Sequence, residues 1–145
     1  MNNYEQMKAI NFEGADFSGD NCSSFNLDKF NFNYANLKRI NLKGASLRGA
    51  YLTKVDLSHA NLEDANLREA GLPKANLYSA NLRNACLIQA CLSHADLRNA
   101  DFTGADMFDS LIDGAKLEGM IIDDGTYDDK GKLRTYELVR CSGDN

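Results

Sequence analysis

The chain has 145 residues, a formal net charge of −5 at pH 7, and charged side chains at 26% of its positions. This length predicts a single domain, and the acidic balance argues against direct binding of nucleic acid through a basic surface. No apolar run approaches the ~18 residues of a membrane span, and the first residues lack the charged-then-apolar pattern of a signal peptide. We therefore expect a cytoplasmic protein that does not bind membranes.

Residues 1–9 precede the main pattern of the sequence and predict an N-terminal cap. Tyr4, Met7 and Ile10 are spaced three apart, which suits one or two helical turns with an apolar stripe. The first coil of a repeat structure exposes core side chains and unpaired backbone groups, which such a segment would cover. We expect a short helical cap.

Leucine then recurs at every fifth residue from Leu57 to Leu97. The residue two positions earlier is Val55 at first and Ala thereafter, and Asn or Asp most often stands between the two. Five residues rotate an α-helix by about 500°, and an odd spacing alternates between the faces of a strand, so both elements would leave many leucines in water. A chain that turns a corner every five residues and coils around its own core keeps all of them inside. The predicted buried leucines are Leu57, Leu62, Leu67, Leu72, Leu77, Leu82, Leu87, Leu92 and Leu97.

This Ala-(Asn/Asp)-Leu-X-X pattern resembles the repeat of the pentapeptide-repeat family, and it keeps its register from Ile10 to Asp124. The resemblance implies an all-β solenoid, a right-handed four-sided (quadrilateral) β-helix with one pentapeptide per side and about six coils of twenty residues. It also implies that the central residue and the small residue before it point inward, and the other three outward. The predicted division is an N-terminal cap (1–9), the β-helix (10–124) and a C-terminal tail or cap (125–145).

The first coils keep the register but depart from the pattern in content. Their small position holds Ile10, Asp20, Phe25, Phe30 and Ile40, so we expect a wider or less regular core at this end. Because an inward carboxylate requires a partner, we expect Asp20 to be turned outward or hydrogen-bonded for structural reasons rather than to form a site.

Stacked coils bring residues twenty apart onto one another. The outward Asn21, Asn41, Asn61, Asn81 and Asp101 should then form a ladder. Asn and Asp side chains bond well to local backbone groups at bends, and stacked amides can bond to each other. We interpret this ladder as structural.

Negative charge is concentrated in the last coils. Residues 101–129 contain nine acidic residues and a single basic residue, Lys116. The candidate acidic end comprises Asp101, Asp106, Asp109, Asp113, Asp123 and Asp124.

Residues 125–145 leave the repeat. Residues 128–131 (Asp-Asp-Lys-Gly) predict a turn between two short extended segments, which favours a hairpin or extended cap over a helix. The apolar residues of this tail need burial, either against the end of the rod or in a homodimer through the C-terminal end. The sequence is compatible with both, and hence with a monomer or a homodimer.

We find no catalytic, metal-binding or cofactor-binding constellation in the sequence. His59 and His94 are predicted on adjacent sides almost two coils apart, and there is no Cys-X-X-Cys, phosphate loop or nucleophile elbow. The four cysteines do not resemble a disulfide framework, so reduced thiols are expected. These features predict a protein that is not an enzyme and needs no cofactor.

Outward aromatic and apolar residues are the better guide to function. Tyr34 and Tyr51 are predicted on one side of the rod and Tyr78 on the next. Ile88 and Phe108 are twenty apart and are predicted to stack on an outer face beside Cys86. The candidate interaction surface comprises Tyr34, Tyr51, Tyr78, Ile88, Phe108 and Leu111.

Two functions fit these features. The first is a non-enzymatic interaction or scaffold module with an unknown protein partner. The second follows from the resemblance, because some members of the family are quinolone-resistance proteins that mimic duplex DNA and bind DNA gyrase, a type II topoisomerase. A DNA mimic needs negative charge along a long face, whereas here basic residues interrupt the body of the rod and the unbroken register leaves no projecting loop. The sequence therefore favours the scaffold.

Overall fold

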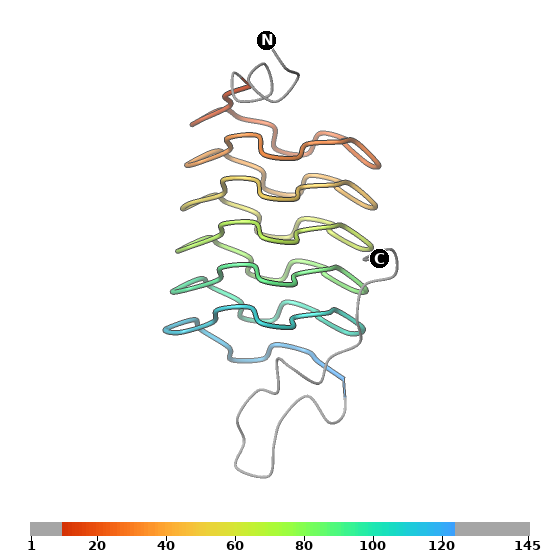
Figure 1. Ribbon diagram of the computed structural model, residues 1–145, viewed down its shortest axis with the longest axis vertical. Coiled ribbons are helices and arrows are strands. Elements are labelled where there is room, and N and C mark those ends of the chain that lie inside the picture. Colours follow the sequence, from red (N-terminus) through yellow and green to blue (C-terminus); the bar gives the residue numbers. More distant parts are fainter. Residues whose placement is uncertain (1–9, 124–145) are drawn as a thin grey trace.

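The computed structural model describes residues 10–123, which form a rod of stacked and closely similar coils (Figure 1). Parallel backbone bridges join residues twenty apart at every fifth position, from Asn11–Asn31 to Asp101–Ile121. Within the described range there is no helix, and the extended backbone is limited to single bridging residues followed by turns. One bridge and one turn per pentapeptide give each coil four sides. The predicted twenty-residue stacking and unbroken register are confirmed over these residues.

The predicted caps at 1–9 and 125–145 lie outside the described residues. So does Asp124, the predicted last residue of the repeat. The domain boundaries and the total number of coils therefore stay predictions.

Each corner is made by a left-handed residue two positions after the central one. Lys54 (φ 52°), Asp64 (φ 58°) and Gly104 (φ 73°) illustrate this geometry. Left-handed backbone costs a residue with a Cβ roughly 1–2 kcal/mol, so something must offset it. Part of the compensation is a hydrogen bond that closes the corner, as from the Ala60 N–H to the Leu57 carbonyl (3.1 Å).

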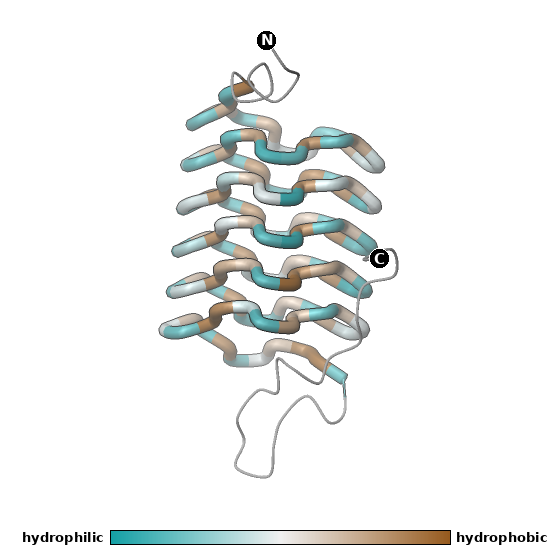
Figure 2. Tube along the Cα trace, viewed as in Figure 1, coloured by the Kyte–Doolittle hydropathy of each residue, from teal (hydrophilic) through white to brown (hydrophobic). Residues whose placement is uncertain are grey.

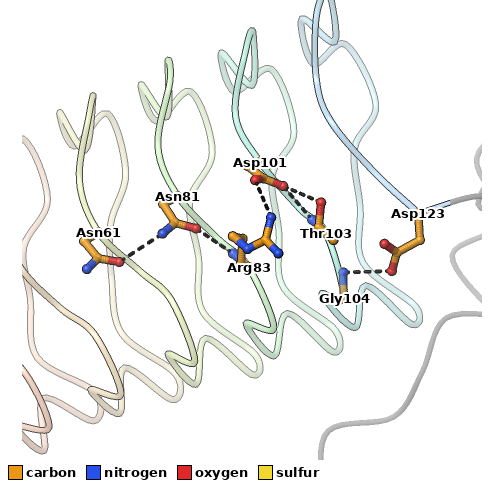
Figure 3. Close-up of polar contacts among 7 residues, drawn as sticks. All are labelled: Asn61, Asn81, Arg83, Asp101, Thr103, Gly104 and Asp123. Atoms are coloured by element: carbon orange, nitrogen blue, oxygen red, sulfur yellow. Dashed lines mark hydrogen bonds and ion pairs between the residues drawn. The ribbon is translucent and has the colours of Figure 1, made fainter.

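The Asn of the motif stabilises the same turn. Its side-chain Oδ1 accepts the N–H two residues later, as between Asn61 and Glu63 (3.1 Å) and between Asn81 and Arg83 (3.0 Å). Its Nδ2 can also donate to the coil before it, from Asn41 to Asn21 (3.1 Å) and from Asn81 to Asn61 (3.4 Å; Figure 3). The structural interpretation of the Asn ladder is thus confirmed.

The core is a continuous column of leucine and alanine. All nine predicted central leucines are at most 1% exposed, and the alanines between them are equally buried. Figure 2 shows the resulting pattern, in which hydrophobic and hydrophilic residues alternate around every coil. Because this core excludes solvent so completely, functional groups must be sought on the outer surface or where the pattern fails.

The pattern fails in the first coils, as expected, but not in the expected way throughout. Asp20 is exposed, in agreement with the prediction of an outward carboxylate. Phe25, expected inward, is 54% exposed, and that expectation is wrong. The next residue in its column is the buried Ala45, so a methyl group fits at this position whereas a phenyl ring turns out to the edge of the core.

Candidate interaction surfaces

One side of the rod differs from the other three in the residues that form its bridges. On this side the bridging column reads Asn31, Tyr51, Gly71, Cys91 and Leu111, whereas Asn and Asp dominate the other columns. We call this side the Tyr51 face. Its exposed members are Tyr34, Tyr51, Lys54, Lys74, His94 and Leu111.

The turns of the Tyr51 face survive without the Asn side chains by two local substitutions. Where Tyr51 offers no acceptor, the Thr53 N–H donates to Asn33 Oδ1 of the preceding coil (2.8 Å). Where Gly71 offers no side chain, the residue two positions later is Pro73, which has no N–H to satisfy. The side chains at the bridging positions of this face are therefore released from turn formation.

Two predicted surface residues meet on the Tyr51 face, and a third lies along it. Tyr34 and Tyr51 share one side, as predicted, and are 55% and 57% exposed. Lys54 places its Nζ 5.7 Å from the centre of the Tyr34 ring, a cation–π arrangement. Leu111, 58% exposed, belongs to the same column as Tyr51, which we did not predict. Reading the bridging positions at a spacing of twenty would have found this.

Tyr78 lies on the next side, as predicted, but it is held by its neighbours. Its ring meets His59 edge-on at 5.7 Å between centroids, and the Arg98 guanidinium carbon lies 5.6 Å from its centre. Its hydroxyl oxygen accepts a hydrogen bond from Asn99 Nδ2 (3.3 Å). Tyr78 is only partly exposed and is fixed in place, so it offers less free surface than Tyr34 and Tyr51.

The predicted outer stack of Ile88 and Phe108 is wrong for Ile88. Phe108 is 36% exposed, whereas Ile88 is only 6% exposed. The stacked coils place Arg68 and Phe108 on either side of Ile88 in its column, and a side chain between two large neighbours loses contact with water. Cys86 nearby is also buried and is disulfide-bonded, contrary to the expectation of reduced thiols, while Cys22 and Cys91 are free.

The acidic end is less exposed than its composition suggests. Asp106 is 2% exposed and its Oδ1 accepts the Phe108 N–H (3.0 Å), so its assignment to an outer acidic surface is wrong. The physical reason is that it occupies the turn-forming position of its repeat. Asp101 pairs with Arg83 (3.1 Å) and accepts from the Thr103 N–H (2.9 Å; Figure 3). Asp124 lies outside the described residues.

The other three carboxylates of this end are exposed, and each accepts a hydrogen bond. Asp123 accepts from the Gly104 N–H (2.8 Å; Figure 3), Asp113 from the Ser93 hydroxyl (2.6 Å) and Asp109 from Gln89 (3.4 Å). These contacts link one coil to the next, so the carboxylates contribute to stacking as well as to surface charge.

Acid is expected to destabilise the rod through Asp96 and Asp101. The bidentate bonds from Arg98 hold the pKa of Asp96 below its usual range, and they outweigh the opposing effect of burial. At Asp101 burial raises the pKa, but bonds from Thr103 and Arg83 lower it further. A carboxylate with a depressed pKa stabilises the fold above its unfolded pKa of about 4, and this stabilisation is lost as the pH falls through the folded pKa.

We therefore expect the melting temperature to fall between about pH 4 and pH 2, and Asp96→Asn to reduce that fall. Thermal unfolding followed by circular dichroism across pH 2–7 measures this. The exposed Asp64→Asn removes the same charge and is the control. An identical pH profile for Asp96→Asn and the native chain would contradict the assignment.

Neither a metal centre nor a membrane span is found within residues 10–123. No group of three or more His, Cys, Asp or Glu in this range could hold a metal ion. The same range contains no helix long and apolar enough to cross a bilayer. His59 and His94 lie on different sides of the rod, as predicted.

These features define a class of protein, a right-handed quadrilateral β-helix built from five-residue repeats. A profile of pentapeptide repeats matches in eight copies, over residues 10–49, 31–71, 50–87, 60–99 and 80–119. The chain belongs to the pentapeptide-repeat family. Comparison with curated proteins finds no match.

Several solved structures share the fold. Rfr23, a pentapeptide repeat protein from the cyanobacterium Cyanothece 51142, is 26% identical with a TM-score of 0.76, covering 84% of this chain and 98% of its own. A pentapeptide repeat protein from Nostoc PCC 7120 is 31% identical with a TM-score of 0.56, covering 83% and 92%. One from the Arabidopsis thaliana thylakoid lumen is 30% identical with a TM-score of 0.52, covering 82% and 72%.

Proposed function

We propose that this protein is a non-enzymatic interaction or scaffold module that binds a protein partner through the Tyr51 face. The observation that carries the proposal is the bridging column of that face, where exposed Tyr51 and Leu111 replace the amide ladder. Asn33 and Pro73 compensate for the missing turn bonds, so the fold does not require these two side chains.

The chemistry of the Tyr51 face suits protein binding. Tyrosine supplies a large contact area at low entropic cost and is enriched at interfaces, whereas acidic side chains are depleted. Tyr34 and Lys54 together add a second aromatic group and a cation beside Tyr51. The described outer surface is a convex coil on which no set of polar groups converges in a cleft, which favours binding over catalysis.

Restoring the ladder on this face is expected to abolish partner binding while keeping the fold. The double variant Tyr51→Asn/Leu111→Asn installs the residue that the other columns use, so its melting temperature should not fall. We expect at least tenfold less of the specific partner to be captured from an extract of the source organism. The variant Lys43→Asn/Asp64→Asn, on a different side, is the control and should capture the partner as the native chain does.

Capture of the same proteins in the same amounts by the native chain and the Tyr51→Asn/Leu111→Asn variant would refute this proposal. Quantitative mass spectrometry of the captured proteins provides the comparison. Circular dichroism melts of each variant show that the fold is intact.

Gyrase binding by DNA mimicry has weaker support. Of the acidic end, Asp106 is buried and Asp101 pairs with Arg83, which leaves Asp109, Asp113 and Asp123 as its exposed described aspartates. A supercoiling assay with and without a quinolone tests this function. Inhibition or protection at micromolar protein that is lost in Asp109→Asn/Asp113→Asn would favour mimicry over the scaffold.

A further inference from the structure

The first coils contain an apolar cavity of about 240 Å³. It arises because three successive inward positions supply too little buried side chain. Asp20 and Phe25 are turned outward, and Cys22 stands where later coils have leucine. Two coils further on, Ala60, Leu62 and Ala65 occupy the same positions and are at most 1% exposed.

Aromatic rings form much of the cavity wall. Phe12, Phe17, Phe30 and Phe32 line it together with Cys22, and Phe25 lies at its edge. The Phe12 ring meets Phe17 edge-on at 5.1 Å and stacks with Phe32 at 5.6 Å. The wall therefore offers both ring faces and ring edges, the two surfaces against which another aromatic ring packs favourably.

The lining is also uncharged. Its side chains are hydrocarbon apart from the Cys22 thiol. Burial raises the pKa of that thiol, and the nearby Asp20 carboxylate raises it further, so Cys22 remains protonated at neutral pH. An ion placed here would lose its hydration without gaining a partner.

We propose that this cavity binds a small uncharged aromatic molecule of about one ring. Apolar cavities of about 150 Å³ stay dry and accept benzene, so the space is sufficient. The site lies inside the rod and is independent of the Tyr51 face, so it adds a small-molecule ligand to the proposed protein partner.

Toluene titrated into the full chain, followed by NMR, tests the proposal. We expect saturable binding, and at least tenfold weaker binding of benzoate, which has a similar ring but carries a charge. Cys22→Leu, which fills the cavity with the residue used by later coils, should weaken toluene binding at least tenfold. Cys91→Ser alters the other free thiol, which lies on the outer surface, and should leave binding unchanged.

Absence of saturable toluene binding, or equal affinity for toluene in Cys22→Leu, would overturn the proposal. Binding that required removal of residues 1–9 would also overturn it, because the cavity would then belong to the N-terminus of the chain itself. The comparison of toluene with benzoate uses the unaltered chain, so it decides the question even if Cys22→Leu fails to fold.

Discussion

Replacing Leu67 with Lys is expected to unfold several coils together. Leu67 is fully buried, and the residues above and below it, Leu47 and Leu87, are buried as well. Truncating a buried leucine to alanine already costs about 2–5 kcal/mol, and lysine adds the cost of an unpaired charge in the core. Because each coil of a solenoid is supported only by its neighbours, the damage should spread along the rod.

Thermal unfolding by circular dichroism measures this effect. The control is Asp64→Lys, on the exposed corner of the adjacent repeat, where Lys29, Lys54 and Lys74 stand in other repeats with the same left-handed backbone. We expect the control to melt close to the native chain. An unchanged melting temperature for Leu67→Lys would mean that the central residue is not inward.

Enlarging the small inward residue is expected to be the next most damaging change. Ala65 is flanked in its column by Ala45 and Ala85, and all three are at most 1% exposed. Ala65→Leu would place a branched side chain where the structure has room for a methyl group. Overpacking of a core typically costs about 1–3 kcal/mol.

Urea unfolding followed by circular dichroism gives the change in the free energy of unfolding. Lys38→Leu adds a leucine to the outer surface and should change stability little. If Ala65→Leu were as stable as the native chain, the small position would be replaceable, and alanine there would not be a requirement of the fold.

The regular part of the molecule could be predicted because one distance determines it. A spacing of five places every central residue inside, and twenty residues per coil place like positions in columns, so the leucine core and the Asn ladder followed directly. Asp20 was also predicted outward, because an unpaired inward carboxylate is too costly.

Other assignments failed because the repeat gives the direction of the Cα–Cβ bond but not the environment of the side chain. Ile88 stands at an outward position, yet its neighbours bury it. Asp106 counts as a surface charge in the sequence, yet it serves as a buried turn acceptor. The cavity was missed because Asp20, Cys22 and Phe25 were each treated as single irregularities. Only their succession in one coil leaves a space.

The column arrangement has a consequence for how this chain tolerates insertions and deletions. Gaining one pentapeptide between Tyr51 and Leu111 would leave leucine at every fifth position, so the core would be unaffected. All later residues would nevertheless rotate by a quarter turn, and Leu111 would move to a different side from Tyr51. An insertion of twenty residues would lengthen the rod and restore the alignment. Length changes of five and of twenty are thus equivalent for folding, but only the second preserves a binding face that spans several coils.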